Sequence, residues 1–421
     1  KETENTGKNK EYTYDGAGRL KTERYDETGG LSSWANKYEY DARGNRAVKE
    51  IVEGTKETVD DFVEETGIYT ATTLSLLPEL TSWAGYAKTY YTYDNNNRLT
   101  FEKWYDTAYM NRESSYTYDN NGNLKNEYTE TWYDNFAPED PTIIHYPDDD
   151  ISYSYNGMNQ LIEVERNGEE YNYVYDGKGQ RVKKTLNGKT IEYVWDGSGN
   201  IIGENEKVYS RGAGGEIVSD GENYYAYNGH GDTTNLVQMS SGTSIALTAT
   251  YEYDAFGNAQ ITGNESAGNP FRYNGQYTDE ETGLIYLRNR YYDPSIGRFT
   301  QEDPYWNVNN MIYGEDGNNG VPSYASIVQS ANLYVYCVYD PVNMVDPSGK
   351  VPYELFSSPL DAAIDWGWNF YAKTDYSEFE QISIIYQISN GSEIYYCYGY
   401  AVDITDNQDS RVNTMGPHFV D

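Results

Sequence analysis

The chain has 421 residues, 48 of them tyrosine, and a formal net charge of −36. Such acidity argues against a nucleic-acid partner for the surface as a whole, because neutralising phosphates requires clustered lysine and arginine. Only 38% of the residues are hydrophobic, so one thick aliphatic core is not expected, whereas 16% aromatic residues in periodic order exclude disorder for most of the length.

The sequence also limits membrane, cofactor and metal assignments. No apolar run approaches the ~18 residues that span a bilayer, so we expect no membrane span. Nothing at Lys1 resembles a secretory signal, and a start inside a repeat pattern suggests part of a longer protein. The two cysteines, Cys337 and Cys397, are too few for a disulfide framework or a four-ligand zinc site. We predict no cofactor and no metal.

A short phrase recurs along the first part of the chain: two aromatic residues flanking one residue, then Asp or Asn, usually with Gly soon after. The first copy reads Tyr12-Thr13-Tyr14-Asp15. Self-similarity of this kind is typical of repeat architectures. Later copies begin at Tyr38, Tyr91, Tyr116, Tyr153, Tyr173, Tyr193, Tyr225, Tyr251 and Phe271.

Each copy predicts a strand, a tight turn and a second strand. The two aromatic residues stand two apart, so they project from the same face of an extended strand, and the Asp-x-x-Gly that follows supplies turn chemistry. A lone hairpin is marginal in water, so we expect neighbouring hairpins to stack into one sheet. The predicted fold class is mainly β, with stacked hairpins in a spiralling sheet that forms part of a shell.

The repeats resemble two kinds of binding site. The segment from Asp119 to Glu130 resembles a calcium-binding loop, but Leu124 occupies the position that requires glycine, so plain hairpin turns are favoured. Tyrosine-rich faces also bind sugars by stacking, although aromatic residues on strands more often pack on one another. Residues 57–71, 136–150 and 307–330 interrupt the pattern and are expected to be surface insertions, the first weakly helical.

From residue 271 the pattern changes. Residues 271–294 read FRYNGQYTDEETGLIYLRNRYYDP, residues 297–304 read GRFTQEDP, residues 332–336 read NLYVY and residues 340–350 read DPVNMVDPSGK. This segment resembles the Rhs repeat-associated core, and the upstream copies resemble the YD repeats of Rhs and teneurin-like proteins. The resemblance covers about four fifths of the chain.

The resemblance implies a β-sheet that spirals into a hollow shell, with the core segment plugging one end. In bacterial members the shell encloses a variable C-terminal toxin domain used in antagonism between cells. The expected partners are then the protein's own C-terminal domain and an immunity protein, and the expected location is secreted or cell surface. The alternative is an adhesion protein whose exposed tyrosines bind a cell-surface glycan.

The resemblance also implies a self-cleaving site. Whether the chain is an enzyme therefore depends on whether this site is active. Some family members cut themselves after an Asp-Pro-x-Gly-Leu ending by means of two aspartates, which match Asp303 and Asp346 here. The cut would follow Lys350, which replaces the leucine. The alternative is that both aspartates cap turns before proline. Arg298 is expected either to hold a carboxylate or to form a surface salt bridge.

Three domains are predicted: residues 1–270 as the repeat sheet, 271–350 as the core segment and 351–421 as a small α+β effector-like domain that is incomplete here. In the last domain a helix is expected from Ser358 and a hairpin around Asn390-Gly391. The candidate residues for hydrolytic or thiol chemistry there are Glu378, Glu380, Cys397 and His418, although Cys397 is expected to serve in packing.

Overall fold

The computed structural model is mainly β. It describes residues 2–3, 9–26, 33–64, 85–106, 109–134, 143–212, 215–239, 245–263, 268–306, 324–350, 353–354, 380–382, 385–389, 394–398 and 402–404. None of the helices in these ranges is long and apolar enough to cross a membrane.

The largest sheet has 17 strands and follows the chain order as an antiparallel meander, with β10 lying beside β9. These strands are β1 (Glu2–Thr3), β2 (Asn9–Tyr14), β3 (Leu20–Asp26), β4 (Ser33–Tyr40), β5 (Arg46–Gly54), β6 (Ala87–Tyr93), β7 (Leu99–Asp106), β8 (Met110–Tyr118), β9 (Leu124–Asp134), β10 (Ile143–His145), β11 (Asp149–Tyr155), β12 (Leu161–Arg166), β13 (Glu169–Tyr175), β14 (Arg181–Leu186), β15 (Lys189–Trp195), β16 (Ile201–Glu204) and β17 (Lys207–Val208).

A second antiparallel sheet continues the meander with six strands, and the core segment carries short strands of its own. The second sheet consists of β18 (Ser210–Arg211), β19 (Ile217–Ser219), β20 (Tyr224–Tyr227), β21 (Thr233–Met239), β22 (Ile245–Tyr253) and β23 (Ala259–Gly263). The core segment contains η3 (Tyr273–Gly275), β24 (Tyr277–Thr278), β25 (Ile285–Tyr286), β26 (Tyr291–Asp293), β27 (Arg298–Phe299), α3 (Tyr324–Ala331), η4 (Cys337–Tyr339) and β28 (Met344–Val345), which pairs with β29 (Tyr353–Glu354).

The hairpin turns repeat one hydrogen-bond arrangement. In the first turn, Oδ1 of Asp15 accepts the backbone N–H groups of Ala17 at 2.8 Å and Arg19 at 3.0 Å. The same arrangement, in which the first turn residue accepts from the second and fourth residues after it, recurs at Asp119 and Asn156. The side-chain oxygens of these turns are therefore engaged by their own backbone, as the turn prediction requires.

The second aromatic residue of the phrase links one hairpin to the next. The hydroxyl of Tyr40 donates to the carbonyl of Leu20, the first residue of β3, at 2.8 Å. Equivalent bonds run from Tyr93, Trp195, Tyr227 and Tyr253 to the first residue of an earlier strand, namely Arg46, Arg181, Ile217 and Thr233. These bonds satisfy carbonyls where neighbouring hairpins diverge towards their turns.

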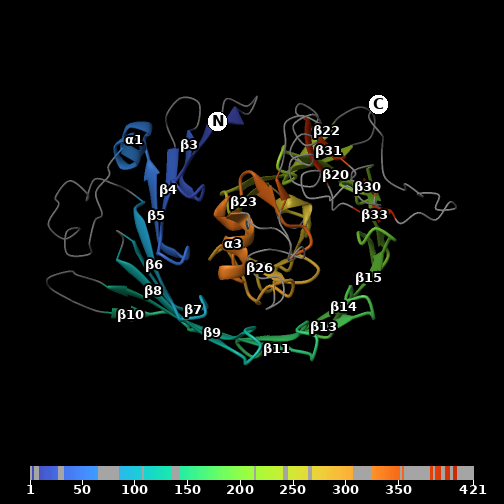
Figure 1. Ribbon diagram of the computed structural model, residues 1–421, viewed down its shortest axis with the longest axis horizontal. Helices are drawn as coiled ribbons and strands as arrows, with labels where there is room; N and C mark the ends of the chain where they lie inside the picture. The colour runs from blue at the N-terminus through green and yellow to red at the C-terminus, as the bar shows by residue number, and fades with distance from the viewer. Residues whose placement is uncertain are drawn as a thin grey trace.

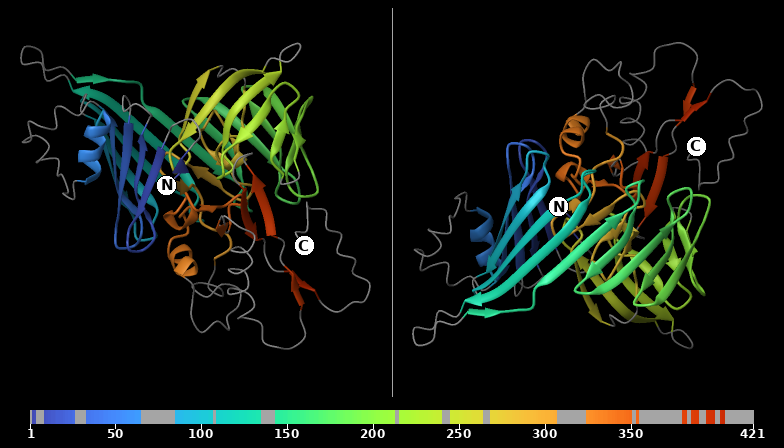
Figure 2. Two further views of the ribbon diagram at one scale, coloured as in Figure 1. Left: turned by 90° about the horizontal axis from the view of Figure 1, so that it is seen from above. Right: turned by 90° about the horizontal axis from the view of Figure 1, so that it is seen from below.

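We call strands β2–β23 the wall and residues 271–350 the core segment. The wall curves around the core segment, so that β26 and α3 lie inside the arc formed by β3 to β15 (Figure 1). Views from above and from below show the core segment, in orange, between the blue-to-cyan and the green-to-yellow parts of the wall (Figure 2). Side chains of the wall and of the core segment share one hydrophobic cluster, which includes Tyr116 and Tyr153 from the wall and Phe271 and Tyr291 from the core segment.

The two ends of the wall meet at a seam between the first hairpins and the turn after β22. Lys10 donates to the carbonyl of Tyr253 at 2.9 Å, and Nζ of Lys49 lies 3.4 Å from Oδ2 of Asp254. Leu20 and Phe256 belong to one buried cluster across the same seam. Contacts more than 200 residues apart in sequence therefore join the beginning of the wall to its end.

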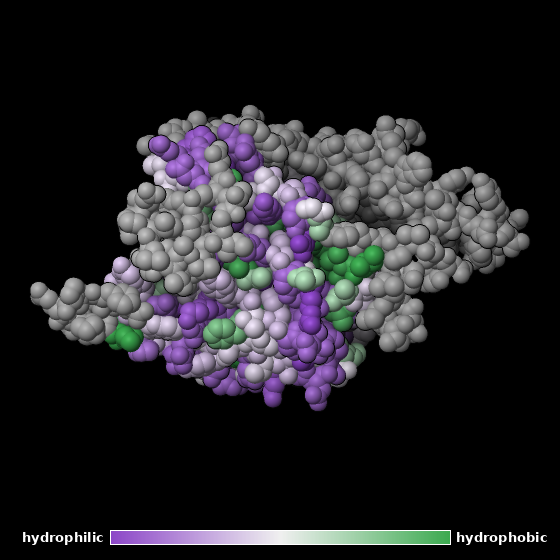
Figure 3. All heavy atoms as spheres, turned by 60° about the vertical axis from the view of Figure 1, so that its left-hand side comes forward, coloured by the Kyte–Doolittle hydropathy of each residue, from purple (hydrophilic) through white to green (hydrophobic). Residues whose placement is uncertain are grey.

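The first aromatic residue of the phrase faces the inside of the arc. In seven copies it is 8% exposed or less: Tyr38, Tyr91, Tyr116, Tyr153, Tyr173, Tyr193 and Tyr251. The middle residue, such as Thr92 or Thr117, is exposed on the other face. The wall surface seen in Figure 3 is mostly hydrophilic, with scattered apolar residues. A continuous exposed tyrosine ladder, which the glycan-binding alternative requires, is absent from these seven copies.

The predicted insertions are partly wrong. The helical expectation for residues 57–71 is confirmed by α1 (Lys56–Glu64), but residues 143–145 and 149–150 belong to β10 and β11 and pair with β9. Hydrogen bonding to the long strand β9 outweighs the prolines that suggested a loop. Residues 324–330, expected in an insertion, form most of α3.

Part of the predicted C-terminal domain lies within the described ranges. Strands β31 (Ile385–Ser389) and β32 (Ile394–Tyr398) pair as the predicted hairpin, and β30 (Glu380–Ile382) pairs with β33 (Val402–Ile404). Glu380 thus lies on β30 and Cys397 on β32. The helix predicted from Ser358, together with Glu378 and His418, lies outside the described residues.

Candidate functional site

The two aspartates singled out in the sequence meet at one guanidinium group. Nη2 of Arg290 lies 3.0 Å from Oδ2 of Asp303 and 3.6 Å from Oδ2 of Asp346. All three side chains are buried, with exposures of 2%, 6% and 2% respectively. Arg290 precedes β26, Asp303 follows β27 and Asp346 follows β28, so three separate parts of the core segment build this site.

The remaining bonds of the site bring the end of the core segment into it. Nε of Arg290 donates to the carbonyl of Gly349 at 2.5 Å. Oδ1 of Asp346 accepts the backbone N–H of Lys350 and the hydroxyl of Ser348, each at 3.1 Å. The peptide between Gly349 and Lys350 therefore has its carbonyl on the guanidinium and its N–H on a carboxylate. Oδ1 of Asp303 accepts the backbone N–H of Tyr305 at 2.9 Å.

Gly349 is required where the chain passes the site. It has a φ of +66°, a conformation that side chains disfavour. A Cβ at this position would lie 2.7 Å from the carbonyl oxygen of Leu287 and 3.1 Å from the backbone nitrogen of Arg290. The close approach of these backbones places the carbonyl of Gly349 on the Arg290 side chain.

Burial sets the protonation of the pair. It raises the pKa of Asp303 to about 6, with Arg290 opposing the rise and Asp346 adding to it. Burial also raises the pKa of Asp346 against the pull of Arg290, whose own pKa burial lowers. Burial thus disfavours the ionised form of both carboxyl groups, and the Arg290 guanidinium favours it.

Arg298 lies elsewhere and has neither of the partners expected for it. It is buried, and it donates to the side-chain oxygens of Asn45 at 3.2 Å and Tyr339 at 2.9 Å, to the carbonyl of Asn97 at 2.5 Å and to Asn332 at 3.2 Å. Asn45 and Asn97 belong to the turns after β4 and β6. Arg298 therefore fastens the core segment to two wall turns, because β27 directs its side chain towards them.

A second group of acids lies between the wall and the core segment. Burial raises the pKa of Glu127 to about 8, with the nearby carboxylates of Asp293 and Glu102 adding to the rise and Arg112 opposing it. Glu102 accepts a bond from Arg112 at 2.9 Å. Within the described ranges, no three or more His, Cys, Asp or Glu residues are grouped so that they could hold a metal ion.

Comparisons with known proteins point to toxins. No protein family model matches the chain. It is 38% identical over 149 residues to the tRNA3(Ser)-specific nuclease WapA of Bacillus spizizenii, covering 34% of this chain and 6% of that protein. It is 37% identical over 82 residues to a toxin protein of Pseudomonas aeruginosa, covering 20% of this chain and 5% of that protein.

A crystal structure of TcdB2-TccC3 without its hypervariable C-terminal region is similar with a TM-score of 0.34 and 18% identity, over 81% of this chain and 18% of that chain. The chain spans less than a tenth of the length of the two curated relatives named above. The sequence similarity supports a relationship to proteins of the Rhs or polymorphic toxin type.

The family resemblance paired Asp303 with Asp346, but the sequence analysis missed Arg290, the residue that joins them. The signal was present in the RNRYYDP string, where Arg290 stands immediately before a strand and close to the GRF motif. With Arg298 in that motif, sequence alone did not distinguish which arginine faces the aspartates.

Proposed function

We propose that residues 1–350 form the carrier part of an Rhs-type toxin and hold the C-terminal segment, residues 351–421, for use against other cells. The observation that carries this proposal is the burial of the repeat tyrosines against the core segment, which makes the inner face of the wall a packed interior. Similarity to two toxins supports the same role. The partners are then the C-terminal segment itself and an immunity protein, and the protein acts outside the cell that makes it.

Protease protection tests the carrier role. We expect residues 351–421 to be digested more slowly in the whole chain than as a separate polypeptide, because the wall and core segment shield them. The variant Asp279→Asn, which removes a buried contact between wall and core segment, should reduce that protection. Equal digestion rates for the attached and the separate segment would contradict the proposal.

A second candidate function is self-cleavage after Lys350. The geometry that favours it is the meeting of two buried aspartates at Arg290, beside the chain that leads to this bond. In this reaction water adds to the carbonyl carbon of Lys350 while one carboxylate takes its proton, and the other carboxyl group gives a proton to the departing amide nitrogen. The products are a carboxylate on Lys350 and a new amino terminus.

Intact-mass measurement tests this second function. A species ending at Lys350 should form in the wild-type chain and disappear in Asp303→Asn and Asp346→Asn. Asp340→Asn is the matched control, because Asp340 also precedes a proline of the core segment but bonds to Asn343 instead of Arg290. An uncut wild-type chain would contradict self-cleavage and leave the carrier role standing.

A further inference from the structure

The seam between the two ends of the wall is held by side chains. The described strands of the two ends belong to separate sheets, so no backbone ladder between them crosses from the first hairpins to β22 and β23. The contacts that do cross include those of Lys10 with the carbonyl of Tyr253 and of Lys49 with Asp254. Such a joint can open locally while each sheet keeps its own backbone hydrogen bonds.

Glu23 of β3 is a buried carboxyl group at this seam. It is 0% exposed, and its Oε2 accepts a hydrogen bond from Nδ2 of Asn36 at 3.2 Å. The backbone N–H of Ala255, which belongs to the turn after β22, interacts with the same carboxyl group across the seam. The two lysines that cross the seam donate to other acceptors. A neutral carboxyl group suits such a buried place better than a charged one.

The other titratable groups around Glu23 come from the strands on both sides of it and from across the seam. Tyr12 of β2 lies opposite Glu23 in the register of the sheet, and the hydroxyl of Tyr38 of β4 lies 3.5 Å from its Oε2. Burial raises the pKa of Glu23 from 4.5 to about 7, with the carboxylate of Asp254 adding to the rise and Lys10 opposing it. Glu23 therefore exchanges its proton near neutral pH.

We propose that the seam is a pH-sensitive joint, which protonated Glu23 holds closed and which loosens when Glu23 loses its proton beside Asp254. The ionised side chain of Glu23 is then a buried charge next to a second carboxylate, and moving the turn after β22 away from β3 returns it to water. This joint is a property of the wall and does not depend on the carrier or self-cleavage functions.

Rising pH should weaken the closed seam. In the opened seam Glu23 is in water and its pKa returns towards 4.5, so the closed seam binds more protons between that value and about 7. The contribution of Glu23 to closure is therefore complete below about pH 4.5 and is lost as the pH rises through about 7. From pH 5 to pH 8.5 the opening equilibrium should rise roughly 50–100-fold.

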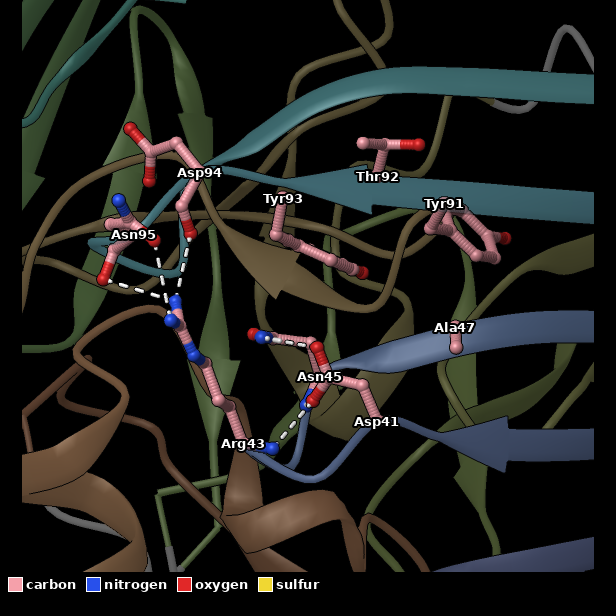
Figure 4. Close-up of a pocket in the computed structure, with 9 residues that line it drawn as sticks. All are labelled: Asp41, Arg43, Asn45, Ala47, Tyr91, Thr92, Tyr93, Asp94 and Asn95. Atoms are coloured by element: carbon pink, nitrogen blue, oxygen red, sulfur yellow. Dashed lines mark hydrogen bonds between the residues drawn. The ribbon is translucent and has the colours of Figure 1, made fainter.

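The joint between the turns after β4 and β6 provides an internal comparison. There Arg43 donates to the backbone carbonyls of Asp94 at 3.4 Å and Asn95 at 3.3 Å (Figure 4). An arginine side chain stays charged throughout this pH range, and a backbone carbonyl does not titrate. We expect this joint to be equally protected at both pH values.

Hydrogen–deuterium exchange followed by mass spectrometry tests the proposal. After correction for the intrinsic pH dependence of exchange, protection in peptides that contain Ala255 should fall roughly 50–100-fold from pH 5 to pH 8.5. Glu23→Gln, which cannot ionise, should remove this fall. Glu39→Gln is the matched control, because Glu39 is an exposed glutamate of β4, and it should behave as wild type.

Asp254→Asn is the second variant. It removes the opposing carboxylate and should make the fall in protection smaller, whereas asparagine can still accept the turn amides, as Asn156 does in its own turn. Equal protection of Ala255 at pH 5 and pH 8.5 in the wild-type protein would overturn the proposal without any variant. So would an undiminished fall in Glu23→Gln or in Asp254→Asn.

Discussion

Replacing Asp279 by Asn should strongly destabilise the protein, because this core-segment carboxylate neutralises two buried cations of the wall. Asp279 is fully buried, with Nη1 and Nη2 of Arg181 at 2.5 and 3.0 Å and Nζ of Lys184 at 2.8 Å. Both cations lie on β14. After the substitution, Glu281 is the remaining carboxylate that bonds to Lys184, and none bonds to Arg181. Breaking a buried ion pair in this way costs about 3–5 kcal/mol.

The loss in the free energy of unfolding is measured by urea unfolding, with tyrosine fluorescence as the signal. Glu280→Gln is the matched control, because Glu280 is the next residue in the chain and its side chain is exposed although it pairs with Arg272. We expect that control to stay within about 1 kcal/mol of wild type. The double variant Arg181→Met with Asp279→Leu should recover much of the loss, because it leaves no charge of this pair buried.

The pH dependence gives a further check on Asp279. Burial alone would raise the pKa of Asp279, but Arg181 and Lys184 hold it below its usual value. Its contribution to stability is therefore present above the unfolded pKa and is lost as the pH falls through the lower folded pKa. If Asp279→Asn lowers the free energy of unfolding by less than about 1 kcal/mol, the core segment is not held on the wall as described.

Three further substitutions test separate parts of the account. Tyr40→Phe removes the hydroxyl bond to Leu20 and should cost about 1 kcal/mol in urea unfolding, whereas no loss would show that these bonds between hairpins are unimportant. Burial raises the pKa of Glu127 to about 8, so the folded protein keeps this side chain protonated where the unfolded chain ionises it, and Tm should fall as the pH rises from 5 to 9. Glu127→Gln should reduce that fall in Tm, and an unchanged fall would show that Glu127 is not its cause. Gly349→Ala forces a side chain onto the carbonyl of Leu287 at a positive φ and should cost at least about 1–2 kcal/mol, and a neutral effect would contradict the close approach at this site.

The repeat phrase predicted local structure well because its physics is local. An aspartate that bonds to its own downstream amides and two aromatic residues on one face specify a hairpin without distant contacts, and Asp15 and Tyr38 behave as predicted. The phrase does not specify how far the sheet curves. The seam depends on Lys10 meeting Tyr253, which lies 243 residues later, and no periodic signal encodes that contact.

The candidate site was only half predictable for a related reason. Asp303 and Asp346 were found through a resemblance. Their common partner depends on the direction in which the short strands of the core segment point each arginine side chain. Strand β27 directs Arg298 to the wall turns, which leaves Arg290 for the aspartates. Likewise, pairing of residues 143–145 with the long strand β9 depends on tertiary contact and overrides the local proline signal.

Tyrosine nitration mapped by mass spectrometry tests the central claim, that the repeat tyrosines form the packed inner face of a wall around the core segment. Under native conditions the account predicts modification of the described tyrosines that are 44% exposed or more, namely Tyr109, Tyr146 and Tyr224. It predicts protection of the first tyrosines of the repeats, Tyr38, Tyr91, Tyr116, Tyr153, Tyr173, Tyr193 and Tyr251, until the protein unfolds. Nitration of these seven residues at the rate of the exposed ones in the folded protein would contradict the account.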